Sequence, residues 1–167
     1  MIIRTAKPDE IDEIMEVYRK AKAFMLSTGN KSQWINGYPQ KELIEEDIRL
    51  GQCIVCEENG IHGVFAFIIG DDPTYNVIED GAWLNDSPYG TIHRIGSDGV
   101  CHGILRNGVA YCREIIDNLR IDTHEDNKVM QHLVVKNGFR RCGIIHIADG
   151  SPRIAYHYVK EEASPED

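Results

Sequence analysis

The chain has 167 residues, of which 42% are hydrophobic and 27% charged, and its 18 basic and 27 acidic residues give a net charge of −9. This composition is typical of one globular domain with a sizeable core. The acidic balance argues against nucleic-acid and anionic-membrane partners, because both are bound through basic patches. Apolar runs are far shorter than the roughly 20 residues that span a bilayer.

In chain order, the first half is expected to form strand 2–5, helix 8–28, helix 39–50, strand 52–57 and strand 61–69. Pro8 and Pro39 each occupy a helix start, and Asn59-Gly60 is a strong hairpin signal. A connection of about 20 residues, 70–90, follows. Segments of that length in a compact domain are usually functional or disordered, and the aromatic residues of this one favour order.

The second half is expected to form strand 91–97, helix 103–117, strand 119–123, a helix capped by Asp126, and strands 141–148 and 153–160. Strands and helices mixed in this order predict an α/β sheet with helices on both faces. The domain is expected to cover residues 1–160. The acidic tail 161–167 is expected to be disordered.

The cysteines predict reduced thiols and no metal centre. Five scattered cysteines behind an N-terminus unlike a signal peptide indicate a cytoplasmic protein. Cys53 and Cys56 have the spacing of a redox motif, but residues three apart on a strand point to opposite faces, and no second pair completes a zinc site. The acidic run from Asp122 to Asp126 resembles a calcium loop but lacks its glycine and final glutamate, so no metal is expected.

The segment Gly99-Val-Cys-His-Gly-Ile104 lies between a predicted strand and a predicted helix. Glycines there let a helix start present free amides to a phosphate, and the amides from Cys101 to Leu105 are the candidates. The segment is neither a Walker loop nor a dinucleotide fingerprint, because the required spacings are missing. Taken alone it could be an ordinary turn.

With its flanking motifs, this segment resembles the GNAT superfamily of acyl-CoA-dependent N-acetyltransferases, over roughly residues 2–160. The carriers are Thr91–Ser97 as the family's fourth strand, Val100–Leu105 as its pyrophosphate loop, Leu119–Asn127 as its fifth strand and following Asn, and Val134-Val-Lys-Asn-Gly-Phe139 as its Tyr-x-x-x-Gly-Phe motif. The segment 72–85 and the aromatic residues before Pro39 resemble one bacterial branch of the family. Three positions depart from the pattern. In the loop, Val100 replaces the usual Arg or Gln and Leu105 is bulky where the loop ends in a small residue, and Val134 replaces the tyrosine that protonates the leaving thiolate.

The resemblance implies a mixed, mostly antiparallel sheet with a central parallel pair, 91–97 and 119–123, and acetyl-CoA as cosubstrate. The cofactor-binding residues that it implies are Ile95, Gly96, Ser97, Cys101, His102, Gly103, Ile104, Leu105, His124 and Asn127. The implied partner is an amine acceptor. Whether that amine belongs to a small molecule or a peptide, and whether the protein is a homodimer, stay open.

Catalytic candidates come from residues beside the expected thioester. His93 is the first choice as the base that deprotonates the amine, because imidazole exchanges protons near neutral pH, and Glu79 is the second. Five acids in 70–90, without Lys or Arg, favour a cationic acceptor or simply solvate a loop. Four aromatic residues are expected to wall the acceptor pocket or to form core beneath the long segments: Trp34, Tyr38, Tyr75 and Trp83.

Four further histidines are expected to be structural or surface residues, with His62, His146 and His157 partly exposed on strands and His132 on a helix surface. The predicted function is N-acetyl transfer from acetyl-CoA to a primary amine by direct attack. The alternative, favoured by Val134 and the altered loop, is a non-catalytic acyl-CoA-binding or regulatory protein on the same fold. A third reading is an interaction domain without a cofactor.

Overall fold

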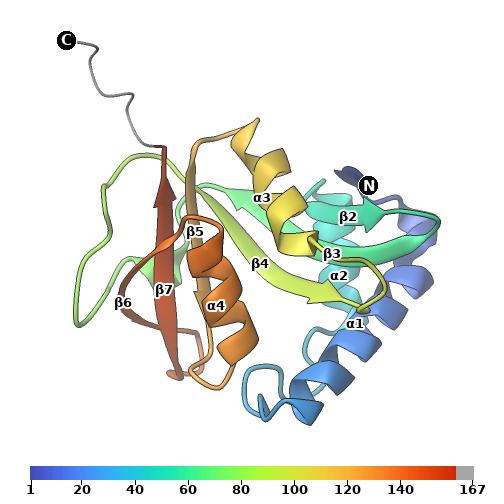
Figure 1. Ribbon diagram of the computed structural model, residues 1–167, viewed down its shortest axis with the longest axis horizontal. Coiled ribbons are helices and arrows are strands. Elements are labelled where there is room, and N and C mark those ends of the chain that lie inside the picture. Colours follow the sequence, from blue (N-terminus) through green and yellow to red (C-terminus); the bar gives the residue numbers. More distant parts are fainter. Residues whose placement is uncertain (161–167) are drawn as a thin grey trace.

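The computed structural model describes residues 1–160 (Figure 1). In chain order the elements are β1 (Ile2–Thr5), η1 (Pro8–Glu10), α1 (Ile11–Ser27), α2 (Lys41–Arg49), β2 (Cys53–Glu57), β3 (Ile61–Ile69), η2 (Pro73–Tyr75), β4 (Gly90–Ser97), α3 (Ile104–Arg113), β5 (Asn118–Thr123), α4 (Lys128–Lys136), β6 (Arg140–His146) and β7 (Pro152–Val159). The tail expected at 161–167 lies outside the described residues.

The strands form one seven-stranded sheet in the order β1-β2-β3-β4-β5-β7-β6. The β4–β5 pair is parallel, and the other neighbouring pairs are antiparallel. This arrangement confirms the predicted mixed sheet with a central parallel pair. The crossover from β4 to β5 runs through α3, as a parallel connection requires.

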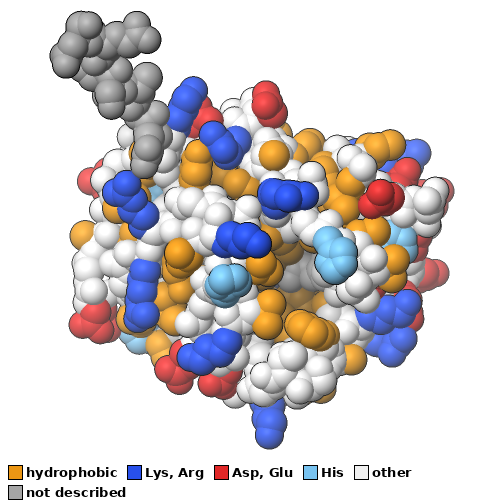
Figure 2. Space-filling model, viewed as in Figure 1, with side chains coloured by type: hydrophobic (Ala, Val, Ile, Leu, Met, Phe, Trp, Pro, Cys, Tyr) orange, Lys and Arg blue, Asp and Glu red, His pale blue; other side chains and the backbone are white. Residues whose placement is uncertain are grey.

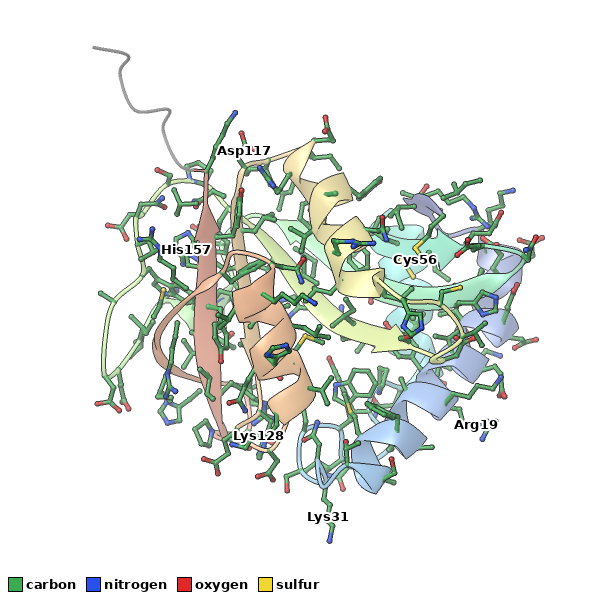
Figure 3. All side chains as sticks on the ribbon, viewed as in Figure 1. Arg19, Lys31, Cys56, Asp117, Lys128 and His157 are labelled. Atoms are coloured by element: carbon green, nitrogen blue, oxygen red, sulfur yellow. The ribbon has the colours of Figure 1, made fainter. Side chains whose placement is uncertain are left out.

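Helices cover both faces of the sheet, as predicted, and β2 shows how the sequence assigns the faces. Ile54 and Cys56 belong to the core beneath α3 and α4, whereas Cys53 and Val55 belong to the core beneath α1 and α2. Figure 3 shows Cys56 beside one end of α3. Burial raises the pKa of both cysteine thiols to about 12, so neither is a reactive thiolate near neutral pH.

Several helix boundaries differ from the sequence prediction; the second helix, for example, begins at Lys41 rather than at Pro39. The α3 helix ends at Arg113 rather than at 117, because the chain must turn before Asn118 enters β5 opposite Val159. The α4 helix is capped by Asn127 rather than by Asp126. The Asn127 side chain accepts a hydrogen bond from the Met130 backbone amide at 3.0 Å, which satisfies one of the free donors of the first turn.

A third core lies beneath the segment 70–90 and orders it. Tyr75, Tyr89 and Trp83 pack there against β6 and β7. The guanidinium of Arg120 lies between the rings of Trp83 and Tyr89, 4.1 and 3.9 Å from their centroids. The long connection is therefore a packed layer on this side of the sheet.

His157 belongs to this layer and corrects a prediction. It is fully buried rather than partly exposed. Its ring accepts a hydrogen bond from the Leu84 amide at Nδ1 and faces Asn118 Oδ1 at Nε2, so His157 anchors the long segment to β7. Figure 3 shows His157 on the side of β7 away from α4. None of the helices within residues 1–160 is long and apolar enough to cross a membrane.

Candidate active site

The β4 and β5 strands diverge soon after they pair. Their register covers Gly90 with Leu119 and Thr91 with Arg120, and no later pair. A bulge in β4 causes the divergence: between the pairs Ala66–His93 and Val64–Gly96, β3 has one residue and β4 has two, Arg94 and Ile95. A bulge bends its strand and leaves backbone groups unpaired. Those of β4 and β5 beyond Thr91 therefore border a gap in the sheet.

Arg94 holds the bulge in place. Its φ of +52° is unusual for a residue with a side chain. Its guanidinium donates to both carboxylate oxygens of Asp47 on α2, at 2.8 and 3.1 Å, and to the hydroxyl of Tyr38 at 3.3 Å. Because Asp47 is buried, this bidentate pair locks the bulge to α2.

A cleft of about 720 Å³ occupies the gap. Its walls come from the segment after α1, the first residues after β3, the diverging strands, the start of α4 and the β6–β7 turn. Of the four aromatic residues expected to wall an acceptor pocket or to form core, Trp34 and Tyr38 line the cleft. Tyr75 and Trp83 do not, because both pack in the third core.

His93 and Asp72 form a hydrogen-bonded pair in the cleft. His93 Nε2 lies 2.9 Å from Asp72 Oδ2, and Asp72 Oδ1 accepts from the amide and hydroxyl of Thr74 at 2.9 and 2.7 Å. Burial alone would raise the pKa of Asp72, but the bonds from His93 and Thr74 outweigh it and hold the pKa at about 2. The carboxylate is thus ionised at neutral pH and fixes the orientation of the ring, leaving Nδ1 available as a proton acceptor.

Glu79, the second catalytic candidate, does not meet His93. It is exposed and outside the cleft, and its backbone pairs with Ile144 of β6. Of the five acids in 70–90, Asp71 and Asp72 line the cleft, whereas the other three do not. Sequence analysis counted Asp72 among those five acids but did not assign it a role beside His93. Its pairing with His93 joins positions 21 residues apart and depends on the fold.

The start of α3 has the geometry expected of an anion site. Gly103 precedes the helix with φ +77°, a conformation that favours glycine, and the first amides of any α-helix lack partners within it. Leu105 is buried in the core, so its bulk points away from those amides. Arg106, which sequence reasoning missed, is exposed in the first turn and adds positive charge there.

Figure 2 shows this face of the molecule, where Lys, Arg and His side chains surround a central hollow and acidic side chains lie mainly near the edge of the view. The face carrying α3 and α4 is thus less acidic than the net charge suggests. This distribution suits an anionic ligand.

The remaining predicted cofactor residues lie along the same strands and turns. Ile95 lines the cleft, Gly96 packs against α1, and the Ser97 hydroxyl accepts from the Gly99 amide at 3.1 Å. Cys101 is half-buried against the core and His102 is exposed; Ile104 is buried beneath the start of α3.

At the other edge of the gap, Asn127 lines the cleft and His124 does not. The Asn127 side chain donates to Gln33 Oε1 at 2.9 Å, which ties α4 to the segment after α1. His124 Nδ1 accepts from the Asp126 amide at 3.0 Å. Among residues 1–160 no group of three or more His, Cys, Asp or Glu side chains could hold a metal ion.

The sheet order, the parallel pair that diverges at a bulge and the glycine-started helix beside it define a GNAT type of fold. No family model matches the sequence, and no curated protein does. Solved structures do match. A GNAT-family acetyltransferase from Streptococcus agalactiae is 35% identical, with a TM-score of 0.80 over 96% of this chain and 96% of its own.

Two more distant structures share the fold. A GNAT-family acetyltransferase from Listeria monocytogenes is 20% identical, with a TM-score of 0.67 over 93% of this chain and 92% of its own. The PaiA N-acetyltransferase from Thermoplasma acidophilum, solved with coenzyme A, is 15% identical, with a TM-score of 0.64 over 95% and 98%. Because the Streptococcus agalactiae acetyltransferase is 35% identical over 96% of both chains, this chain belongs to the GNAT family of acetyltransferases.

Proposed function

We propose that this protein transfers an acetyl group from acetyl-CoA to a primary amine by direct attack, with His93 as the base. The observation that carries the proposal is the His93–Asp72 pair, which lies in the cleft beside the bulge of β4. A histidine oriented by an ionised carboxylate is a recurrent arrangement for taking a proton from a nucleophile.

The donor is proposed to bind across the diverging strands. Its pyrophosphate would lie at the start of α3, against the amides from Cys101 to Leu105, with Arg106 nearby. Its pantetheine arm would run along Ile95–Ser97 and past Asn127 toward the cleft. The free backbone groups of the diverging strands suit its two amides. Coenzyme A bound to the PaiA relative supports the same ligand class here.

In the reaction, the amine nitrogen attacks the thioester carbonyl carbon. The N–C bond forms, the C–S bond breaks, and coenzyme A leaves as a thiolate. His93 Nδ1 takes the proton that the amine loses, and Asp72 faces the positive charge that the ring then carries. Holding amine and thioester in contact supplies much of the acceleration.

The leaving thiolate gets no proton from position 134. Val134 is 1% exposed and packs in the core beneath α4, outside the cleft. A thiol with a pKa of about 8.5 is a tolerable leaving group, so water can supply the proton. The same residue favours the second candidate function, an acyl-CoA-binding protein that does not catalyse transfer.

Two measurements on the purified protein separate these functions. Calorimetric titration tests whether acetyl-CoA binds, and a thiol-release assay over a panel of primary amines tests turnover. We expect binding together with amine-dependent thiol release. Binding without release on any amine would favour the non-catalytic function, and absence of binding would refute both.

A further inference from the structure

Arg153 is a buried cation with incomplete partners. It is 5% exposed and lines the cleft, and Asp122 and Asp149 interact with its charge, yet no carboxylate within residues 1–160 is in direct ion-pair contact with it. Its hydrogen bonds go to two backbone carbonyls, those of Pro152 at 2.8 Å and Gln33 at 3.4 Å. A guanidinium has five N–H donors and stays charged in proteins. Buried charges are normally paired, so we expect the guanidinium of Arg153 to bind an anionic group of a ligand.

The sheet registers place Arg153 and His93 on the same face. Thr91 pairs with Arg120 and Asp122 pairs with Ala155, so His93, Asp122 and Arg153 all project from one face of three adjacent strands. All three line the cleft. Two paired-strand spacings are about 10 Å, and because β4 and β5 have diverged at this level and Arg153 lies beyond the last β5–β7 pair, the backbones at His93 and Arg153 are further apart than that. A long arginine side chain spans much of that distance, which leaves room for a molecule of a few carbon atoms.

The carboxylates around the cleft are distributed unevenly. Asp72 and Asp122 lie near His93, and Asp122 also accepts a hydrogen bond from Tyr75 at 2.6 Å. Asp71 and Asp149 are exposed at the rim. Asp122 interacts electrostatically with both His93 and Arg153, and Asp149 also acts on Arg153, so Arg153 is a cation set among carboxylates. A cleft that presents both signs of charge complements a molecule carrying charges of both signs.

We propose that the acceptor is a small amine that also carries a carboxylate, of the free amino-acid class. Its amino group would lie at His93 and its carboxylate on the guanidinium of Arg153. Asp72, paired with His93, attracts the ammonium form before deprotonation. A polyamine would gain nothing from Arg153 and would be repelled by it. This inference rests on the proposed acetyl transfer and names its substrate class.

The test compares amines matched in length, with and without a carboxylate. Glycine, β-alanine and γ-aminobutyrate are set against ethylamine, propylamine, butylamine and putrescine in the thiol-release assay. Charge-assisted hydrogen bonds predict kcat/KM at least about tenfold higher for the best amino acid than for its matched amine. Arg153→Gln should remove this ratio, Arg153→Lys should keep part of it, and the exposed control Arg19→Gln should leave it unchanged. Circular dichroism confirms that each variant is folded.

Binding provides a readout that does not depend on turnover. The same acids and amines are titrated into the protein saturated with coenzyme A, and we expect the acids to bind more tightly to the parent but not to Arg153→Gln. Equal binding of acids and matched amines, or a preference unchanged in Arg153→Gln, would overturn the inference. So would better use of a C-terminally blocked peptide that begins with aspartate. Loss of thiol release with the binding preference intact would refute the proposed reaction and leave the ligand class standing.

Discussion

His157 should make the stability of this protein depend on pH between about 6.5 and 4. The ring is fully buried, edge-on to Trp83 with centroids 5.7 Å apart. Burial, with a smaller contribution from Arg120, lowers its pKa from 6.5 to about 4. As the pH falls from 6.5 to 4, His157 binds a proton in the unfolded state but stays mostly neutral in the folded state. Stability is therefore fully present above about pH 6.5 and is lost progressively toward pH 4.

The gap between these pKa values corresponds to on the order of 3 kcal/mol, a large share of a typical domain's stability. We propose His157→Gln as the perturbation, since its amide can accept from the Leu84 amide and donate to Asn118 without titrating. Urea unfolding followed by tryptophan fluorescence gives the free energy of unfolding at each pH. Between pH 7 and pH 4 the parent should lose about 3 kcal/mol more than the variant. His146→Gln, exposed on β6, should follow the parent. Parallel curves for parent and His157→Gln would refute the reasoning.

Three further predictions concern the donor site, the leaving group and the bulge. Gly103→Glu should weaken coenzyme A binding at least about tenfold in calorimetry, because it adds negative charge at the helix start. Gly103→Ala reports the backbone strain and the tight Cβ contacts with Asn107 and Arg106 without the charge, and equal affinity in Gly103→Glu would show that the pyrophosphate binds elsewhere. Val134→Tyr should leave the rate of thiol release unchanged or raise it if the new side chain is accommodated, and a large loss in a stably folded variant would contradict the placement of this helix. Asp47→Ala leaves the half-buried Arg94 without its ion-pair partner and should lower the free energy of unfolding by about 3 kcal/mol or more, whereas the exposed Glu46→Ala should cause a much smaller loss; similar losses would refute a structural role for the pair.

Local patterns predicted most of the fold. Alternation in β2 assigned Cys53 and Cys56 to opposite faces, and the Asn59-Gly60 turn placed the β2–β3 hairpin; both agree with the structure. The predictions were wrong where tertiary packing determines the end of a helix or the burial of a side chain. The α3 helix ends early because β5 must begin, and the buried His157 could not be recognised while the layer formed by 70–90 was unknown.

The candidate site was predictable only in part. His93 followed from its strand, and Gly103 from its place between strand and helix. Asp72 and Arg153 could not be chosen, because Asp72 reaches His93 only through the packing of the long segment, and Arg153 lines the cleft only through the arrangement of β4, β5 and β7. Tyr75 and Trp83 show the converse. Their aromatic character suited a pocket wall, but in the structure both side chains pack against apolar residues of β6 and β7 in the third core.

The most direct test of the central claim is acetyl transfer by His93→Ala, measured with the best amine acceptor and with acetyl-CoA affinity determined on the same sample. Removing a general base typically costs 100-fold or more in rate, so we expect kcat to fall by about that factor while donor affinity stays within about twofold. His146→Ala, which removes an exposed imidazole outside the cleft, should match the parent. An undiminished kcat in His93→Ala would contradict the account.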